Sequence, residues 1–311
     1  MKPPPLQRTI ALFAMGLCLI ITNAGNARTQ NTLPADTSST SSFKNAVVFL
    51  DKLEKLEPSP YWPHIQPALF LQNLKTNIRQ PLSPYQGRGT NFCGYGAFTY
   101  LLLKDDPLGY VQLLLQLYQK GRAEYAGIMF NPSNRVKVAA GNLKFKGILD
   151  IRPAEQMWYL CLADHFKGYL NIFNRQYDPG DEDLFWASVN YAKFNRMLQK
   201  MLHFKVQAKG GDIIRPHTGD LFGYITQKLA TGQVILFINN RLVHKKDHTK
   251  LKLGVPTHFI VLDEITKTGN TITLTYWDYG GKTLMQLTPA FLKKITFGIT
   301  HCTKKREADA S

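Results

Sequence analysis

Apolar residues recur at helical spacing through most of the first two thirds of the chain. Segment 43–56 has apolar positions three and four residues apart after a serine-rich start, which is typical of a helix that buries one face. Prolines, glycines and polar turns divide the rest of this pattern into further predicted helices at 68–78, 93–103, 108–121, 153–164, 182–202 and 221–229. Segment 136–149 alternates only weakly and contains two glycines, so we expect it to be irregular with one short strand.

The pattern changes after residue 232. Segment 233–238 is a short continuous apolar run that is typical of a buried strand. Segments 257–265 and 271–281 flank a turn at Gly269 and Asn270, which predicts a hairpin. Further strands at 283–287 and 296–301, with a short helix at 289–294, complete this part. The chain is therefore predicted to be α+β, with helices first and an antiparallel sheet last.

The N-terminus has the pattern of an export signal. Lys2 and Arg8 precede the apolar run 10–22, which is too short to span a membrane comfortably, and small residues follow up to Ala27. We interpret 1–27 as a secretory signal peptide, with a membrane anchor as the alternative. Segment 28–42 is polar and predicts a disordered linker; 43–305 is one domain and 306–311 a flexible tail. The protein is expected to be exported, periplasmic or extracellular, with no transmembrane helix after processing.

The formal net charge of +16 could serve contact with nucleic acid, anionic lipid or acidic cell-wall polymers. The chain has no helix-turn-helix, zinc-finger or stacked-aromatic motif, so we expect no specific nucleic-acid partner. Solubility and loose binding to anionic envelope polymers explain the charge more simply. No Cys-x-x-Cys or His-x-x-x-His spacing indicates a metal, and no cofactor is predicted.

Three cysteines follow the signal peptide, and in an oxidising compartment an odd count leaves at least one thiol free. Cys161 and Cys302 either pair or remain buried single thiols. Cys93 ends a polar, glycine-rich loop and opens an apolar segment, which places it in the first turn of a helix. The free N–H groups and the dipole there favour a thiolate, the nucleophilic form. A small buried cysteine is the alternative interpretation.

A base and its orienting group are predicted on the hairpin. His258 begins one strand and Asp278 ends the next, so the two side chains should be neighbours and the carboxylate can reach the imidazole. This is the geometry that fixes a histidine tautomer and stabilises an imidazolium. Taken singly, His258 could be a satisfied strand-end histidine and Asp278 a turn-forming aspartate.

In this order, Cys93-Gly94, the segment 257–262 (THFIVL) and the segment 276–280 (YWDYG) resemble the papain-like cysteine peptidase superfamily, and are most similar to its bacterial C39-like branch. The resemblance implies a helical lobe carrying Cys93 and a sheet lobe carrying His258 and Asp278. It also implies an oxyanion donor before the cysteine. Gln86 is the first candidate, although it lies seven residues upstream where the family usually has six, and Asn91 is the second. Trp277 either shields the His–Asp pair or fills the core, and the helical insert 111–220 has no assigned role.

The resemblance implies a secreted cysteine hydrolase that cleaves an amide or peptide bond through a Cys93–His258–Asp278 triad and a thioacyl-enzyme intermediate. Its substrate would be a peptide, a protein or peptidoglycan. The alternatives are a peptidoglycan amidase or endopeptidase, a toxin-type deamidase or transglutaminase on the same triad, and a catalytically silent binding module. The presence of all three polar positions favours an enzyme over the binding module.

Overall fold

The computed structural model describes residues 41–53, 55–87, 89–143, 151–167, 176–243 and 255–304. The predicted signal peptide, most of the linker 28–42 and the tail 306–311 lie outside these residues. The last two linker residues are part of the fold: Ser42 accepts a hydrogen bond from the backbone N of Asn45, and Ser41 Oγ accepts one from Leu108 N. The described chain is α+β, as the sequence predicts.

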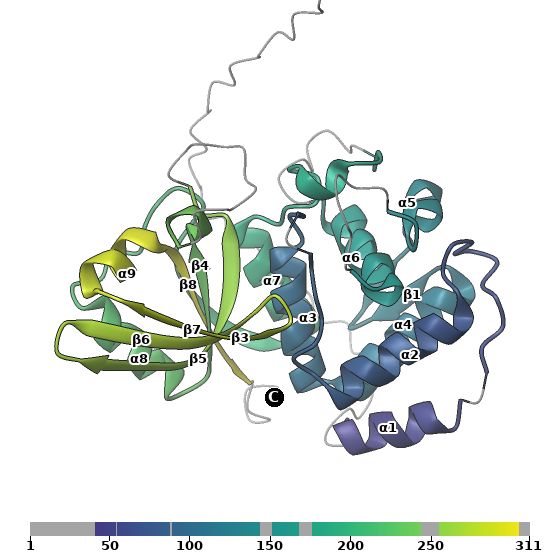
Figure 1. The fold of residues 1–311 in the computed structure, drawn as a ribbon, viewed down its shortest axis with the longest axis horizontal. Helices are drawn as coiled ribbons and strands as arrows, with labels where there is room; N and C mark the ends of the chain where they lie inside the picture. Colours follow the sequence, from purple (N-terminus) through teal and green to yellow (C-terminus); the bar gives the residue numbers. More distant parts are fainter. Residues whose placement is uncertain are drawn as a thin grey trace, which may run out of the picture. The chain divides into compact units, whose positions relative to one another are not determined.

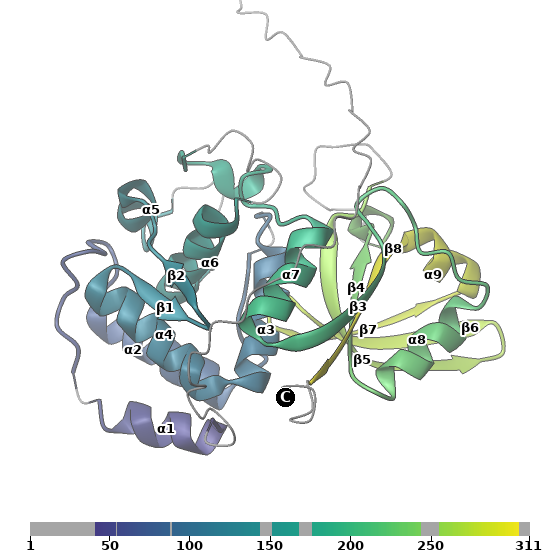
Figure 2. The ribbon, with the colours of Figure 1, turned by 180° about the vertical axis from the view of Figure 1, so that it is seen from behind.

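Helices dominate the chain up to residue 166 (Figures 1 and 2). Proline at the first helical position starts several of them, where its fixed φ and missing N–H cost nothing. None of the described helices is long and apolar enough to cross a membrane. In chain order they are α1 (Phe43–Asp51), α2 (Pro67–Arg79), α3 (Cys93–Asp105), α4 (Pro107–Lys120), α5 (Asn134–Ala139) and α6 (Pro153–Phe166), with the small hairpin β1 (Ala123–Tyr125) and β2 (Ile128–Phe130) between α4 and α5.

A six-stranded antiparallel sheet occupies the C-terminal part, with the spatial order β3-β8-β4-β5-β6-β7. Its strands are β3 (Phe204–Gly210), β4 (Gln233–Ile238), β5 (His258–Thr268), β6 (Thr271–Asp278), β7 (Gly281–Leu287) and β8 (Thr296–Lys304). The helices that accompany it are α7 (Tyr191–Met201), α8 (Leu221–Leu229) and α9 (Pro289–Ile295). The predicted hairpin is therefore the β5–β6 pair.

Both faces of the central strand β4 are buried, which explains its continuous apolar sequence. One face, with Phe237 and Phe259, joins the core of the helical part, and ring centroids of these two residues are 4.1 Å apart. The other face, with Leu236 and Ile260, packs under α8 and α9 (Figure 2). One core thus links α3 to the central strands of the sheet.

Several local predictions are wrong. Segment 136–149 was expected to be irregular, but α5 covers its start, and residues 144–150 lie outside the described part. Of the helix predicted for 182–202, only α7 (Tyr191–Met201) is present. It is preceded by the short 3-10 turn η2 (Asp181–Asp183) and a non-helical stretch that contains the buried Trp186. Backbone contact between Asn91 and Glu182 holds that stretch, a long-range constraint that local periodicity does not contain. Strand β3 was not predicted: Phe204, Val206 and Ala208 alternate with polar residues, but the strand is short and mostly exposed.

Cys161 on α6 and Cys302 on β8 are buried free thiols. Of the two alternatives for these cysteines, the structure therefore has single thiols and no disulfide. Burial raises the pKa of both thiols, and the value for Cys302 is about 12. Neither side chain is a nucleophile under ordinary conditions, because the neutral thiol is poorly reactive.

Candidate active site

Cys93 is the first residue of α3 and its side chain is partly exposed. Phe92 is the N-cap residue of α3, and its side chain makes no capping hydrogen bond to the N–H groups of the first turn. The Cys93 thiol lies against the start of β5, where Sγ is 3.5 Å from Thr257 O. The predicted helix-start position of Cys93 is confirmed.

Gly94 allows α3 to approach the sheet closely. A Cβ added at this position would lie 2.2 Å from Val189 Cγ1 and 3.2 Å from Phe259 Cδ2, distances at which something must shift. The glycine after the cysteine is thus required by packing between α3, the segment before α7 and strand β5. This contact sets Cys93 beside the residues that begin β5.

His258 and Asp278 lie at neighbouring strand ends, as the hairpin predicts. His258 is the first residue of β5 and Asp278 the last of β6, and Nε2 of the histidine is 2.7 Å from Oδ1 of the aspartate. Both side chains are almost completely buried. Because Nε2 faces Asp278, Nδ1 is the ring nitrogen left for Cys93, which lies close enough to contribute to raising the pKa of the imidazole, while its Sγ donates to the neighbouring Thr257 O. The structure therefore brings Cys93, His258 and Asp278 together.

The environment of His258 favours its protonated form. Burial by itself lowers the pKa of the imidazole, but the Asp278 carboxylate, Tyr279 and the hydrogen bonds to Asp278 and Cys93 raise it well above its ordinary value. The Tyr279 ring stacks on the imidazole with centroids 4.8 Å apart. A proton on His258 is the charge that stabilises a thiolate at Cys93.

The first oxyanion candidate, Gln86, is fully buried beside the first turn of α3. A Cβ added at Gly96 would lie 3.0 Å from its Oε1 and clash with the side chain. Neither Nε2 nor Oε1 has a hydrogen-bond partner among the residues that the structure describes. A buried amide without a partner is rare in proteins and costly, which makes Gln86 an unusual group at this place.

The second candidate, Asn91, is engaged elsewhere. Its backbone N donates to Glu182 O at 2.7 Å and its Nδ2 donates to Leu184 O at 3.0 Å. The segment that it holds belongs to the insert 111–220, and Leu184 and Phe185 on it are 44% and 49% exposed. Sequence reasoning missed this contact, because no local signal links residue 91 to residues 182–185.

Trp277 packs in the core rather than standing at the surface. Its ring stacks on Tyr100 of α3 with centroids 4.9 Å apart, and its Nε1 donates to Leu82 O at 2.9 Å. Trp277 thus connects β6 both to α3 and to the loop that leads to Gln86.

A hollow of about 950 Å³ on the surface of α2 and the segment before it is lined by residues that belong to none of these groups. The residues that line this hollow include no cysteine and no histidine, so it offers no Cys–His pair. Within the described ranges, no cluster of His, Cys, Asp or Glu side chains could hold a metal ion.

The fold and the site together define an α+β protein in which Cys93, at the start of a helix, lies beside a hydrogen-bonded His258–Asp278 pair on the sheet. No protein-family model matches the chain, and neither the curated proteins nor the solved structures contain a significant match.

Proposed function

We propose that this chain is a cysteine hydrolase that cleaves an amide or peptide bond, with its helical and sheet parts arranged as the two lobes of a papain-like peptidase. The observation that carries the proposal is the continuous contact from Asp278 through His258 to Cys93 at the start of α3. Cysteine–histidine pairs oriented by a third polar group are the activated nucleophiles of acyl transfer.

In the proposed reaction, the Cys93 thiolate adds to the substrate carbonyl and forms a tetrahedral oxyanion. His258, protonated because of Asp278, donates its proton to the leaving amine as the C–N bond breaks, which leaves a thioester on Cys93. Neutral His258 then takes a proton from water, the hydroxide adds to the thioester, and the acid product leaves as the thiolate and the imidazolium re-form.

We assign stabilisation of the oxyanion to two donors, the Cys93 backbone N–H and the Gln86 side-chain amide. The Gln86 amide has no other described partner, whereas one Asn91 N–H already donates to Leu184. An oxygen that gains charge in the transition state would satisfy the Gln86 amide at that step only, which is the condition for catalysis.

Peptidoglycan is the substrate that the charge of the protein favours, which makes an exported peptidoglycan amidase or endopeptidase the second candidate. A basic protein is attracted to acidic envelope polymers, and the export signal predicted at 1–27 would deliver it there. A deamidase would use the same triad and water to hydrolyse a side-chain amide, and a transglutaminase would use an amine as the acyl acceptor in place of water.

The test compares the wild type with Cys93→Ala on casein and on purified peptidoglycan, with mass analysis of the fragments. Cys302→Ala, which removes a buried thiol outside the site, is the matched control. We expect cleavage by the wild type and by the control, and none by Cys93→Ala. Fragments from peptidoglycan alone would identify the amidase or endopeptidase. Cleavage that survives Cys93→Ala would refute the proposal, and binding without cleavage by the wild type would indicate the binding module.

A further inference from the structure

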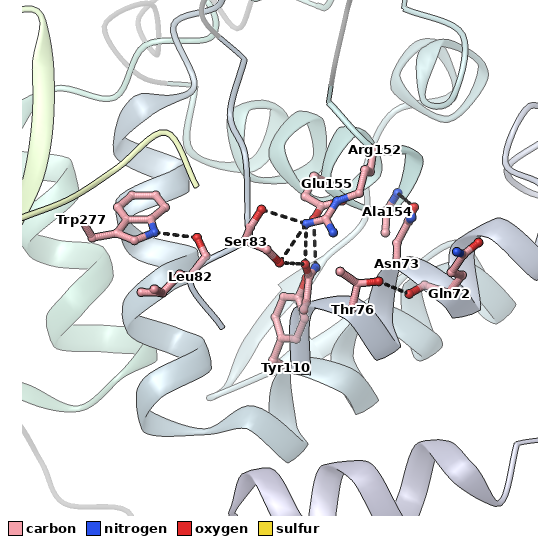
Figure 3. A network of polar contacts seen from close by, with 11 residues as sticks. Gln72, Asn73, Thr76, Leu82, Ser83, Tyr110, Arg152, Ala154, Glu155 and Trp277 are labelled. Atoms are coloured by element: carbon pink, nitrogen blue, oxygen red, sulfur yellow. Dashed lines mark hydrogen bonds and ion pairs between the residues drawn. The ribbon is translucent and has the colours of Figure 1, made fainter. Parts of the chain in front are cut away.

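The loop that leads to Gln86 is held at successive residues by two distant parts of the chain (Figure 3). On one side, Trp277 donates to Leu82 O, as described above. On the other side, Arg152 Nη2 donates to Ser83 O at 3.0 Å. Figure 3 shows these two side chains reaching the loop from opposite directions.

Ile151, the residue before Arg152, contacts the other end of the same loop, at Gly87. Gly87 adopts a left-handed conformation with φ of 81°, and a Cβ placed there would lie 2.8 Å from Ile151 Cδ1. Ile151 therefore packs directly on the backbone at Gly87, while Arg152 binds the backbone at Ser83. These two contacts bracket Gln86.

Arg152 is itself fixed by buried partners. Its Nη2 lies 2.6 Å from Asn77 Oδ1 and forms an ion pair with Glu155, whose side chain is fully buried. Asn77 in turn donates from Nδ2 to Glu155 Oε1 at 2.9 Å and to Tyr110 OH at 2.9 Å. The guanidinium is thereby anchored directly on α2 and α6, and on α4 through Asn77.

We propose that Arg152 is a positioning residue for the oxyanion donor: by binding Ser83 O, it fixes the loop 83–87 and holds the Gln86 amide against Gly96 in the first turn of α3. This inference rests on the proposed function of the Cys93 site. Arg152 does not touch the reacting atoms; it acts through the loop backbone.

The chemistry of arginine suits this role. A planar guanidinium holds a carbonyl, an amide oxygen and a carboxylate in fixed directions, whereas a lysine ammonium is a rotating point charge. The nearer acceptor on the loop is the main-chain carbonyl of Ser83 at 3.0 Å; the Ser83 hydroxyl accepts from the same Nη2 at 3.4 Å and donates to Asn77 Oδ1 at 3.2 Å. Removing Arg152 alone would leave Glu155 buried without its cation. Burial raises the pKa of this carboxyl and Arg152 lowers it, so the charge and its partner should be removed together.

Two reactions at the same sulfur separate positioning from general damage. In alkylation by iodoacetamide, the Cys93 thiolate displaces iodide and no oxyanion forms. In acylation by p-nitrophenyl acetate, the thiolate adds to the carbonyl, an oxyanion develops, and p-nitrophenolate leaves. Both rates are measured on the full chain, and modification of Cys93 is read from the peptide that carries it. The ratio of the acylation rate to the alkylation rate is the readout.

The variants are Arg152→Lys and the double variant Arg152→Met with Glu155→Gln. Gln86→Ala is the reference for a lost oxyanion donor. Arg79→Met is the control; Arg79 lies on α2 and pairs with Asp51, and both side chains are exposed. We expect the ratio to fall about tenfold or more in both Arg152 variants and further in Gln86→Ala, and to stay unchanged in Arg79→Met.

Each outcome decides a different point. An unchanged ratio in either folded Arg152 variant, with a lowered ratio in Gln86→Ala, overturns the positioning role and leaves a structural ion pair. An unchanged ratio in Gln86→Ala overturns it as well, because the loop would then carry no donor. If Cys93 of the wild type reacts with neither reagent faster than a free thiol, the proposed function fails instead. Far-UV circular dichroism confirms that each variant is folded at the assay temperature.

Discussion

Nε2 of His258 lies 2.7 Å from Oδ1 of Asp278, and both side chains are buried at the ends of paired strands. Burial by itself lowers the pKa of the imidazole, and the Asp278 carboxylate is the chief reason why that pKa is nevertheless raised.

Replacing Asp278 by Asn should move the basic limb of the pH–rate profile to lower pH. The proposed reaction needs protonated His258 to protonate the leaving amine, so we expect activity to fall as pH rises through the pKa of that group. Asp278 raises this pKa, hence its removal lets the proton leave at lower pH. The measurement is kcat/KM from about pH 5 to 10 for both proteins, a range around the ordinary histidine value. A basic limb at the same pH in both would contradict the assignment.

Replacing His258 by Gln should slow labelling of Cys93 by a thiol-directed epoxide at neutral pH. An imidazolium beside Cys93 supplies a positive charge that favours the thiolate, and a neutral glutamine amide supplies none. His301→Gln is the control, because its ring Nε2 lies 3.1 Å from the Thr231 hydroxyl and it belongs to another part of the sheet. Equal labelling of the wild type and His258→Gln would count against the Cys–His pair.

Replacing Gly94 by Ala should destabilise the fold by about 1–3 kcal/mol, the usual cost of overpacking a dense core. The new methyl group would lie 2.2 Å from Val189 Cγ1, so α3 and the segment before α7 must separate. Urea unfolding measures the loss. The double variant with Val189→Ala should recover part of it, and Gly219→Ala, where no atom lies within 4 Å of the new Cβ, serves as the control. A loss in Gly219→Ala as large as in Gly94→Ala would remove the packing explanation.

Gln86→Ala and Asn91→Ala should differ in what they change. Loss of the Gln86 amide should lower kcat about 10²- to 10³-fold with little change in KM, because the amide acts on the transition state. Loss of the Asn91 amide removes its hydrogen bond to Leu184 O and should chiefly lower stability, by about 1 kcal/mol. Steady-state kinetics with urea unfolding of both variants is the measurement. A larger fall in kcat for Asn91→Ala would make Asn91 the donor.

Much of the local structure follows from residues close together in the chain. Pro107 and Pro153 begin α4 and α6, and α8 has the predicted bounds 221–229. The β5–β6 hairpin has its turn at Gly269 and Asn270, so its strand ends, and with them His258 and Asp278, are brought together by a short-range pairing. Apolar periodicity, helix-starting prolines and turn residues are therefore enough to predict these features from the sequence.

Other features depend on contacts between residues far apart in the chain. Strand β3 exists through its pairing with β8, and the break before α7 is held by Asn91. Strand β3 alternates apolar and polar residues but is largely exposed, and it was not predicted; the break before α7 has no local signal, and a helix was wrongly predicted there.

By itself, the sequence determined the α+β class, the helix-start position of Cys93 and the neighbouring positions of His258 and Asp278, because each follows from periodicity or from a hairpin. Only the tertiary structure decided that the cysteine reaches the histidine, that Gln86 is buried without a described partner, and that Arg152 and Trp277 hold the loop in between. The physical reason is that these contacts join elements whose distance in space is set by packing of the shared core and not by their separation along the chain.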